Sequence, residues 1–544
     1  MNAKDRIKEA INALQKRTFY SAYPENPKAY AEDANAIGLT AFQKQLNEPF
    51  PGLYDEGCEG RIGEEVSPYM QVGLGIDYPK FSVSTLIENA NSAHSYWKNI
   101  LPTQRAEILL ECLDAVKERF FELAYATMHT TGQSFVMSFQ ASGPHANDRA
   151  LESIALGIQE LTRFNSNVEW VKNMGKFDLK INKNFKPISK GIGLVIGCST
   201  FPTWNTVPGV FANLIAGNSV IVKPHPKSIL PIAIVIAEMQ KVFANHNLPQ
   251  TIVQLAPDVI SNPITKELAE HKLVKLIDYT GGSQFGDYIE SLPNKTVFTE
   301  KAGVNSLILE SFNDPKSVFG NIAFSASLYS GQMCTAPQNI FVSKDGIQTT
   351  EGNLSYDEIV NGIQNAIKGL ADNPKMGPFT LGAIQNDVTK KRVETVAFDN
   401  NVTAFSLDQI NPDFPDARMV IPMVVAVDST DSQWKEECFG PLLFVVKTDS
   451  HNDSLDLAKE LGEIKGAITC SCYSSNKEYQ AKVEETMNNV FVPVSFNFTG
   501  AAFVNQHAAF SDFHVTGGNP SGNATFTDAL FINRRFVWVG NRFA

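Results

Sequence analysis

Short apolar runs alternate with helix-like segments between residues 191 and 301. The runs are typical of buried strands because they are short, apolar and bounded by turn residues. In the segments between them apolar residues recur every three or four positions, as in helices. Strand candidates are 191–197, 219–223, 251–256 and 273–279, and helix candidates are 206–218, 229–246 and 263–271. This alternation predicts parallel βαβ units with right-handed crossovers.

The rest of the chain shows other patterns. Residues 86–163 are helical in periodicity, whereas residues 1–85 are rich in Tyr, Pro, Gly and Asn and are interpreted as an extension that wraps or caps a neighbour. A second α/β section follows residue 300, with segments at 305–310, 339–346, 362–372 and 441–447. Period-two alternation predicts a strand pair over 176–190 and a partner strand in the tail near 531–539.

Length, charge and cysteine content narrow the class of protein. A chain of 544 residues is expected to form about two to four domains. The 46 basic and 58 acidic residues give a net charge of −12, which disfavours nucleic acid as a partner. The seven scattered cysteines lack a CxxC pair and the nine histidines lack metal-ligand spacing, so we predict free thiols and no metal. Without a signal peptide or a membrane span of about 18–20 residues, a cytoplasmic enzyme is expected.

Glu300 and Cys334 give the strongest indication of chemistry. Glu300 lies in the strand-like run VFTEKAG, and Cys334 lies in YSGQMCTAPQNIFV. A carboxylate and a thiol on neighbouring elements can converge on one pocket. That pairing suits a thiol nucleophile with a base that later activates water. A buried cysteine without this context is usually an inert packing residue.

Three strand candidates end in unusual segments, and parallel sheets bind ligands at such ends. The segments are GCSTFPTWN (197–205), VKPHPKS (222–228) and YTGGSQFG (279–286). The glycine pair lets backbone approach a ligand, and the helix start beyond it can hold a phosphate. No GxGxxG follows a strand, so the usual dinucleotide fingerprint is absent.

Five segments in order resemble the aldehyde dehydrogenase superfamily over roughly residues 85–530. They are IAGNSVIVKP, YTGGSQFG, TEKAG, SGQMCTA and EECFGP. The resemblance implies that Cys334 is the nucleophile and Glu300 the water-activating base. It also implies an NADP or NAD site that includes Lys223, His225, Gly281, Gly282, Ser283, Glu437 and Phe439.

The resemblance implies a three-part α/β fold for oxidation of a small-molecule aldehyde. A parallel-sheet, Rossmann-type cofactor domain and an α/β catalytic domain would be joined by a β-flap for oligomerisation. We expect a homodimer or a homotetramer. The expected boundaries are 1–85 for the extension, 86–165 and 191–302 for the cofactor domain, 303–510 for the catalytic domain, and 166–190 with 511–544 for oligomerisation.

Two departures from the family pattern affect the site. Thr200 stands at the position of the oxyanion-hole asparagine, so Thr200, Asn205 or the backbone N–H of Cys334 could hold the oxyanion. Pro226 stands where many NAD-preferring members carry a glutamate, with His225 and Lys227 beside it. Cations in place of a carboxylate favour a 2′-phosphate, so we predict a preference for NADP.

Details such as CSTFPTWNTVPGVFA, KPHP and the long extension are similar to the phenylacetate-degradation aldehyde dehydrogenases (the PaaN group). This narrower resemblance implies a role in aromatic catabolism and a CoA-linked semialdehyde as a possible substrate. Glu300 favours hydrolysis to a free acid. Two alternatives stay open: a CoA-acylating aldehyde dehydrogenase, and a catalytically weak scaffold that kept the fold.

Overall fold

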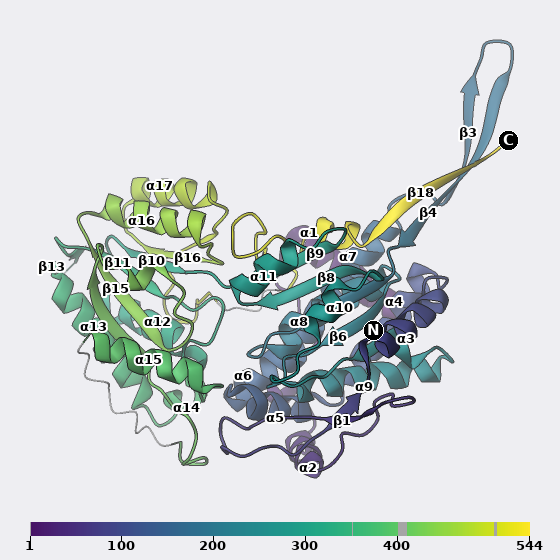
Figure 1. Ribbon diagram of the computed structural model, residues 1–544. Coiled ribbons are helices and arrows are strands. Elements are labelled where there is room, and N and C mark those ends of the chain that lie inside the picture. Colours follow the sequence, from purple (N-terminus) through teal and green to yellow (C-terminus); the bar gives the residue numbers. More distant parts are fainter. Residues whose placement is uncertain (1, 351, 401–410, 505–508) are drawn as a thin grey trace.

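The computed structural model describes residues 2–350, 352–400, 411–504 and 509–544. Two parallel sheets occupy the two halves of the molecule, and a three-stranded antiparallel sheet projects from one half (Figure 1). The predicted α/β class, with parallel sheets and a β-flap, is confirmed.

The first sheet has the order β7-β6-β5-β8-β9, and all its neighbouring strands are parallel. Its central strands, β5 and β6, are buried throughout because helices cover both faces. Its strands are β5 (Ile192–Ile196), β6 (Ser219–Lys223), β7 (Val253–Leu255), β8 (Val274–Gly281) and β9 (Thr296–Lys301). Every strand predicted between residues 191 and 301 is present, with ends shifted by up to two residues.

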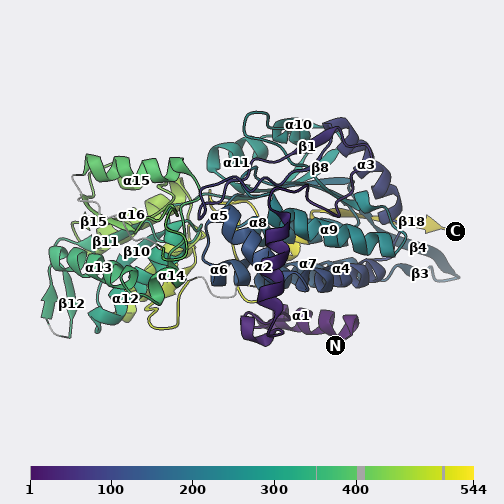
Figure 2. The ribbon, with the colours of Figure 1, turned by 90° about the horizontal axis from the view of Figure 1, so that it is seen from below.

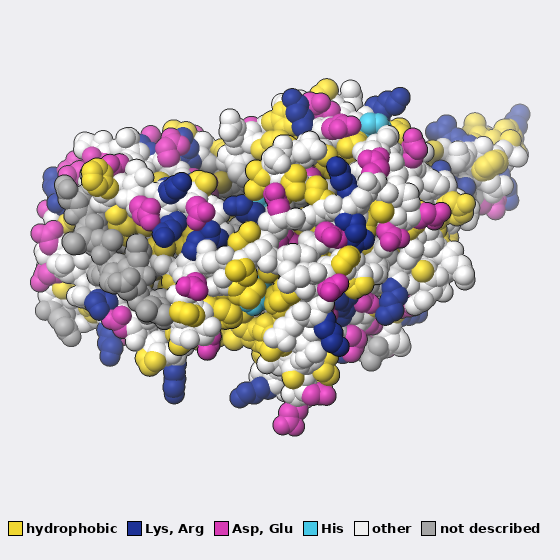
Figure 3. Space-filling model, turned by 60° about the horizontal axis from the view of Figure 1, so that its bottom comes forward, with side chains coloured by type: hydrophobic (Ala, Val, Ile, Leu, Met, Phe, Trp, Pro, Cys, Tyr) yellow, Lys and Arg dark blue, Asp and Glu magenta, His cyan; other side chains and the backbone are white. Residues whose placement is uncertain are grey.

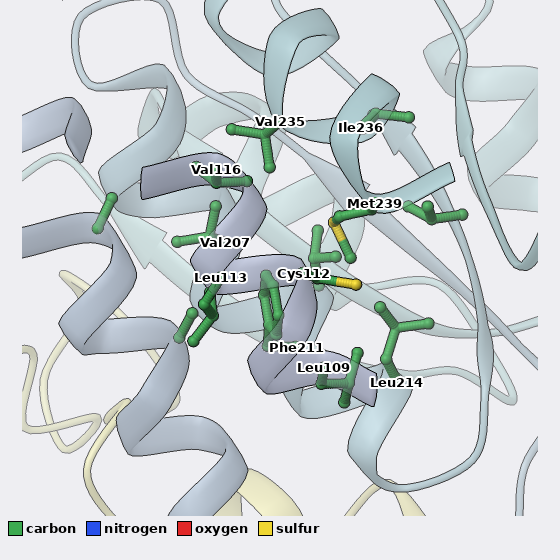
Figure 4. Close-up of a cluster of buried hydrophobic side chains, with 14 of the residues drawn as sticks. Leu109, Cys112, Leu113, Val116, Val207, Phe211, Leu214, Val235, Ile236 and Met239 are labelled. Atoms are coloured by element: carbon green, nitrogen blue, oxygen red, sulfur yellow. The ribbon is translucent and has the colours of Figure 1, made fainter. Parts of the chain in front are cut away.

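Helices α3, α10 and α11 lie on one face of this sheet, and α8 and α9 lie on the other (Figure 2). Behind α8 and α9, helices α4 and α7 complete a core in which Leu109, Phe211 and Met239 interlock (Figure 4). The helices are α3 (Val83–Trp97), α4 (Pro102–Lys117), α5 (Phe120–Thr131), α6 (Phe135–Gln140), α7 (Ala146–Leu161), α8 (Pro202–Ile215), α9 (Leu230–Asn245), α10 (Thr265–Glu270) and α11 (Ser283–Glu290).

The second sheet has the order β14-β15-β11-β10-β16-β17 and is also parallel. Its strands are β10 (Ser306–Leu309), β11 (Asn339–Ser343), β14 (Met423–Asp428), β15 (Leu442–Thr448), β16 (Cys470–Tyr473) and β17 (Val494–Phe496). Its helices are α12 (Pro315–Ser327), α13 (Tyr356–Ala371), α14 (Met376–Thr380), α15 (Asp387–Asp399), α16 (His451–Ile464) and α17 (Lys477–Asn488), and a small hairpin is formed by β12 (Ile347–Thr349) and β13 (Gly352–Leu354).

The antiparallel sheet consists of β3 (Asn167–Asn173), β4 (Asp178–Ser189) and β18 (Phe536–Phe543), with α18 (Ala529–Asn533) before the last strand. The predicted strand pair over 176–190 is instead the single strand β4, because the hairpin turn comes earlier, at Gly175 with φ +86°. The tail strand pairs with β4 as predicted, although it begins at Phe536.

Residues 2–82 lie against the half of the molecule that contains the first sheet (Figures 1 and 2). Helix α1 (Ala3–Lys16) packs on α7, and α2 (Ala34–Gln45) packs on α5. Strands β1 (Gly60–Ile62) and β2 (Tyr78–Lys80) form a short hairpin. The buried carboxylate of Glu65 accepts hydrogen bonds from the backbone of Ile229 and Leu230, so this segment caps the start of α9.

The surface agrees with the acidic, mixed composition. Acidic and basic side chains are interspersed over the face in Figure 3, without a continuous basic patch there. Among the described residues, no helix combines the length and the apolar character needed to cross a bilayer.

Candidate active site

Glu300 lies near the end of β9, where the sheet edge meets the carboxyl-terminal tail. It is 2% exposed. The tail runs beside β9, since Glu300 and Gly522 form an antiparallel bridge and Lys301 N–H donates to the carbonyl of Ser521 (2.6 Å). This pairing brings His514, from far along the sequence, to the Glu300 carboxylate.

Cys334 follows a left-handed turn after α12. Tyr329, Ser330 and Gly331 have φ values of 51°, 50° and 68°, a conformation that is costly for the first two. Contacts hold them there: the Tyr329 hydroxyl donates to the Thr131 carbonyl (2.5 Å), and Ser330 Oγ donates to the Gly382 carbonyl (2.8 Å). The turn directs the following residues, including Cys334, toward the half of the molecule that contains the first sheet.

Asn305, just before β10, holds the nucleophile loop. Its Nδ2 donates to the carbonyls of Cys334 (2.7 Å) and Ala336 (3.0 Å). Its Oδ1 accepts from the N–H groups of Ile468 (3.0 Å) and Thr469 (3.2 Å). One buried amide therefore joins the loop to the chain that leads into β16.

The side chains of Glu300, Cys334, His514 and Asn205 meet at one place. The Cys334 thiol and a Glu300 carboxylate oxygen lie within 4.8 Å of each other. Asn205 Nδ2 donates to Glu300 Oε2 (2.8 Å), and His514 Nε2 lies 3.4 Å from Glu300 Oε1. The sequence prediction that Cys334 and Glu300 converge agrees with this geometry.

Electrostatics keep the carboxylate charged and the thiol protonated. Burial alone would raise the pKa of Glu300, but His514, Arg149 and the Cys334 thiol together hold it below its usual value. Burial raises the pKa of Cys334 well above the ordinary range, and the charges of Glu300 and Cys198 add to this. The resting site therefore needs a proton acceptor beside the thiol, and Glu300 is in that position.

Arg149 lies fully buried on α7, stacked 4.1 Å from the centre of the Trp204 ring and 4.6 Å from that of Phe526. Its guanidinium has no hydrogen-bond partner among the described residues. Its positive charge favours the ionised forms of the Glu300 carboxylate and the Cys334 thiol.

Thr200 makes its described contacts with Gln133 and Cys198. Its carbonyl accepts from Gln133 Nε2 (2.8 Å), and Thr200 lowers the pKa of the Cys198 thiol, which donates to Asn205 Oδ1 (3.7 Å). Asn205, the alternative oxyanion donor, lies on the pocket wall together with Cys334. Burial raises the pKa of Cys198 to about 11, which agrees with a packing role for this thiol.

A pocket of about 960 Å³ opens in front of Cys334. Its wall is mostly aliphatic and aromatic, and the described lining residues include no Lys or Arg. The two segments 401–410 and 505–508, which lie outside the described residues, contain neither residue type. The apolar part of the wall includes Met137, Phe201, Trp204, Phe324, Leu328, Met333, Phe379, Ile468, Phe491, Val492, Phe498, Phe503 and Phe513.

Both ends of the chain contribute to the mouth of this pocket. Phe19 and Glu25 of the extension and Phe513 of the tail belong to its lining. The guanidinium of Arg17 stacks 3.8 Å from the centre of the Phe513 ring and donates to the Thr527 carbonyl (3.1 Å). The extension is therefore part of the substrate pocket and not only a cap on the helices.

The predicted cofactor residues lie at the carboxyl ends of β6 and β8. Lys223 ends β6, is 3% exposed, and forms an ion pair with Asp258 (2.6 Å). Gly281 ends β8, and Gly282 and Ser283 begin α11. A Cβ on Gly282 would meet nothing within 4 Å, so there is open space in front of this helix start for a phosphate. These residues fit a nicotinamide dinucleotide.

Glu437 and Phe439 lie on the loop before β15, and this loop is tied to the nucleophile segment. Gln338 Oε1 accepts from Cys438 N–H (2.7 Å), and a Cβ on Gly331 would lie 2.5 Å from the Gly440 carbonyl. Burial raises the pKa of Glu437 to about 7, against the effect of Arg392, which donates to the Phe439 carbonyl (2.6 Å).

His225 is half-buried and makes a local contact. Burial, Lys223 and Lys227 lower its pKa to about 4, and its Nδ1 accepts from Lys227 N–H (3.2 Å). It is therefore neutral near pH 7.

The sequence model of the aldehyde dehydrogenase family matches residues 77–501. The chain belongs to the aldehyde dehydrogenase family. Among known relatives of this aldehyde dehydrogenase is the benzaldehyde dehydrogenase YfmT of Bacillus subtilis, which is 24% identical over 461 residues, or 82% of this chain and 89% of the relative.

Solved structures agree. An NAD-dependent aldehyde dehydrogenase from Burkholderia multivorans is 42% identical to this chain. The two superpose with a TM-score of 0.95 over 99% of this chain and 98% of the Burkholderia chain. A Thermus 1-pyrroline-5-carboxylate dehydrogenase with bound NAD shares the fold at 18% identity, with a TM-score of 0.75 over 97% and 99% of the two chains. The predicted enzyme class is confirmed, and the relatives' names include the predicted cofactor NAD.

Several site residues of this aldehyde dehydrogenase were not predicted from sequence. His514, Arg149, Asn305 and Asp258 lie in segments without a recognised motif. The only available signal for Asp258 was its place after a predicted strand end, and none marked His514.

Proposed function

We propose that this aldehyde dehydrogenase oxidises an uncharged aldehyde with a bulky apolar or aromatic body to the carboxylic acid. The observation that carries the proposal is the meeting of the Cys334 thiol and the Glu300 carboxylate at an apolar pocket of about 960 Å³. The benzaldehyde dehydrogenase relative supports an aryl aldehyde.

The residues of the chain suggest a sequence of steps. Cys334 attacks the carbonyl carbon, and its proton passes to Glu300, whose carboxylate lies beside the thiol. A bound dinucleotide, held by Lys223, Gly281–Ser283 and Glu437, would supply a hydride acceptor. After releasing that proton to solvent, Glu300 takes a proton from the water that attacks the Cys334 thioester; the C–S bond breaks, the thiolate regains a proton, and the acid is released.

Asn205 and the backbone N–H of Cys334 are the proposed donors to the oxyanion. Asn205 belongs to the pocket lining, whereas Thr200 does not. In the resting structure the Asn205 amide donates to Glu300 Oε2. To stabilise the oxyanion, Asn205 would give up this hydrogen bond and donate to the oxyanion instead.

NAD is proposed as the better cofactor, although the sequence favoured NADP. The neutral His225 offers no charge to a 2′-phosphate, and the other cation, Lys227, lies within electrostatic reach of Asp387 and Glu64. The name of the Burkholderia relative, an NAD-dependent enzyme, supports this choice.

A CoA-linked semialdehyde, as in phenylacetate catabolism, is the second candidate substrate because the pocket volume exceeds what benzaldehyde needs. Against it, the described lining holds no Lys or Arg for the CoA phosphates, although Arg17 stacks on the lining residue Phe513.

A panel of aliphatic, aromatic and CoA-linked aldehydes, with NADH and NADPH absorbance followed in parallel, tests the proposal. Aromatic aldehydes with NAD should give the highest kcat/KM, and the product should be the free acid with or without added CoA. Oxidation of CoA-linked aldehydes alone, or a CoA thioester as product, would favour the alternatives. Cofactor reduction that persists in Cys334→Ala would remove the nucleophile from the mechanism.

Assembly and location are also proposals. The antiparallel flap exposes Val171, Leu179, Ile188, Val537, Val539 and Phe543, which supports a homodimer formed through this sheet. All seven cysteines are unpaired, which supports the cytoplasm as the location. Light scattering of the purified protein would measure the assembly.

A further inference from the structure

Three possible metal ligands from distant parts of the chain meet at the pocket wall. One ligand atom each from Cys334, Glu300 and His514 all lie within 4.8 Å of one another. Thiolate, imidazole and carboxylate are the ligand types that zinc takes in proteins. We propose that this cluster binds a zinc ion, which occupies the nucleophile and the base together and so inhibits the enzyme reversibly.

The spacing already fits part of a tetrahedral site. With Zn–N and Zn–O bonds of about 2.0–2.2 Å, tetrahedral nitrogen and oxygen ligands lie about 3.4 Å apart. His514 Nε2 and Glu300 Oε1 are 3.4 Å apart. The corresponding distance to sulfur is about 3.6 Å, so each distance from Cys334 Sγ needs to shorten by about 1.2 Å at most.

Neighbouring side chains hold two of the ligands in place. Asn205 donates to Glu300 Oε2 and leaves Oε1 for the metal. The His514 ring packs edge-on against Trp204, with 5.0 Å between ring centres, and stacks parallel to Phe526 at 6.4 Å. Such support around the ligands raises metal affinity because fewer rotations are lost on binding.

The ion would have access to solvent and a balanced charge. Cys334 and His514 both line the pocket, so the fourth position would face it and hold water. Zinc replaces the thiol proton, which leaves as H⁺, and the thiolate and the Glu300 carboxylate neutralise the two positive charges. Arg149 repels the ion, so we expect weaker binding than in structural zinc sites, and tighter binding as pH rises.

The test measures metal binding and not turnover, so it does not depend on the identity of the aldehyde. Chelator-treated protein is titrated with Co²⁺, whose absorption reports thiolate ligation and tetrahedral geometry, and then with competing Zn²⁺. We expect one ion per chain, thiolate-to-cobalt absorption, and protection of Cys334 from iodoacetamide. Cobalt binding without the thiolate band would overturn the proposal.

Variants identify the ligands. Cys334→Ala should abolish the thiolate band, and His514→Gln should weaken zinc at least about tenfold. Cys198→Ser is the matched control, because this second thiol lies close by but outside the cluster, and its zinc affinity should equal that of the parent. Unchanged affinity in His514→Gln, or a large loss in Cys198→Ser, would contradict the proposed ligand set. If His514→Gln fails to fold, the cobalt spectrum of the parent still decides the question.

Discussion

Replacing Asn305 with alanine should damage both the stability and the active site. The side chain is 3% exposed and makes four hydrogen bonds, two of them to carbonyls of the nucleophile loop at Cys334 and Ala336. At roughly 0.5–1.5 kcal/mol for each bond, the loss is about 2–6 kcal/mol. The released loop should also misplace the thiol, and a shift of about 1 Å can cost on the order of 100-fold in rate.

Asn218→Ala is the matched control for this experiment. Asn218 is also buried and makes four hydrogen bonds, to Lys190, Gly191, Asn213 and Arg535, at the other end of the sheet from Cys334. Both variants should unfold at lower denaturant concentration. Only Asn305→Ala should lower kcat/KM per folded molecule and change the rate at which iodoacetamide labels Cys334. Equal loss of kcat/KM in the two variants would refute a positioning role for Asn305.

Three further outcomes follow from the site. In Glu300→Gln, iodoacetamide should label Cys334 faster at neutral pH, because the carboxylate that raises the pKa of Cys334 is gone; the rate should rise about tenfold for each unit by which this pKa falls. Product release should nevertheless stall in this variant. Slower labelling of Cys334 would count against this reasoning. Asn205→Ala should lower kcat by about 100–1,000-fold and Thr200→Ala far less, and the reverse order in steady-state kinetics would assign the oxyanion to Thr200. Phe19→Ala should raise KM about threefold to tenfold for aromatic aldehydes but not for acetaldehyde, and an equal change for both would remove Phe19 from the pocket.

The fold was largely predictable because its strands are buried on both faces. Runs such as 219–223 have an apolar centre and are buried along their whole length, and the helices between them keep a clear period. Strand β3 was missed because the hairpin turn at Gly175 depends on a single backbone conformation rather than on a pattern. Beyond its first helix the extension has little periodicity, so its contribution to the pocket lining had no local signal.

The candidate site was predictable only where short motifs carry it. Cys334 and Glu300 lie in such motifs, and the structure brings them together. His514 comes to Glu300 because the tail pairs with the edge of β9 near Gly522, a long-range contact that periodicity does not reveal. The side-chain pairing of Lys223 with Asp258 likewise depends on the order of the strands in the sheet.

The contact between Arg17 and Phe513 has a consequence for biosynthesis. During translation the thiol at residue 334 is made long before the tail that completes the pocket. A nascent chain could fold its first sheet and still lack the wall that excludes water from the sulfur. The pocket would thus be complete only after the two ends of the chain meet.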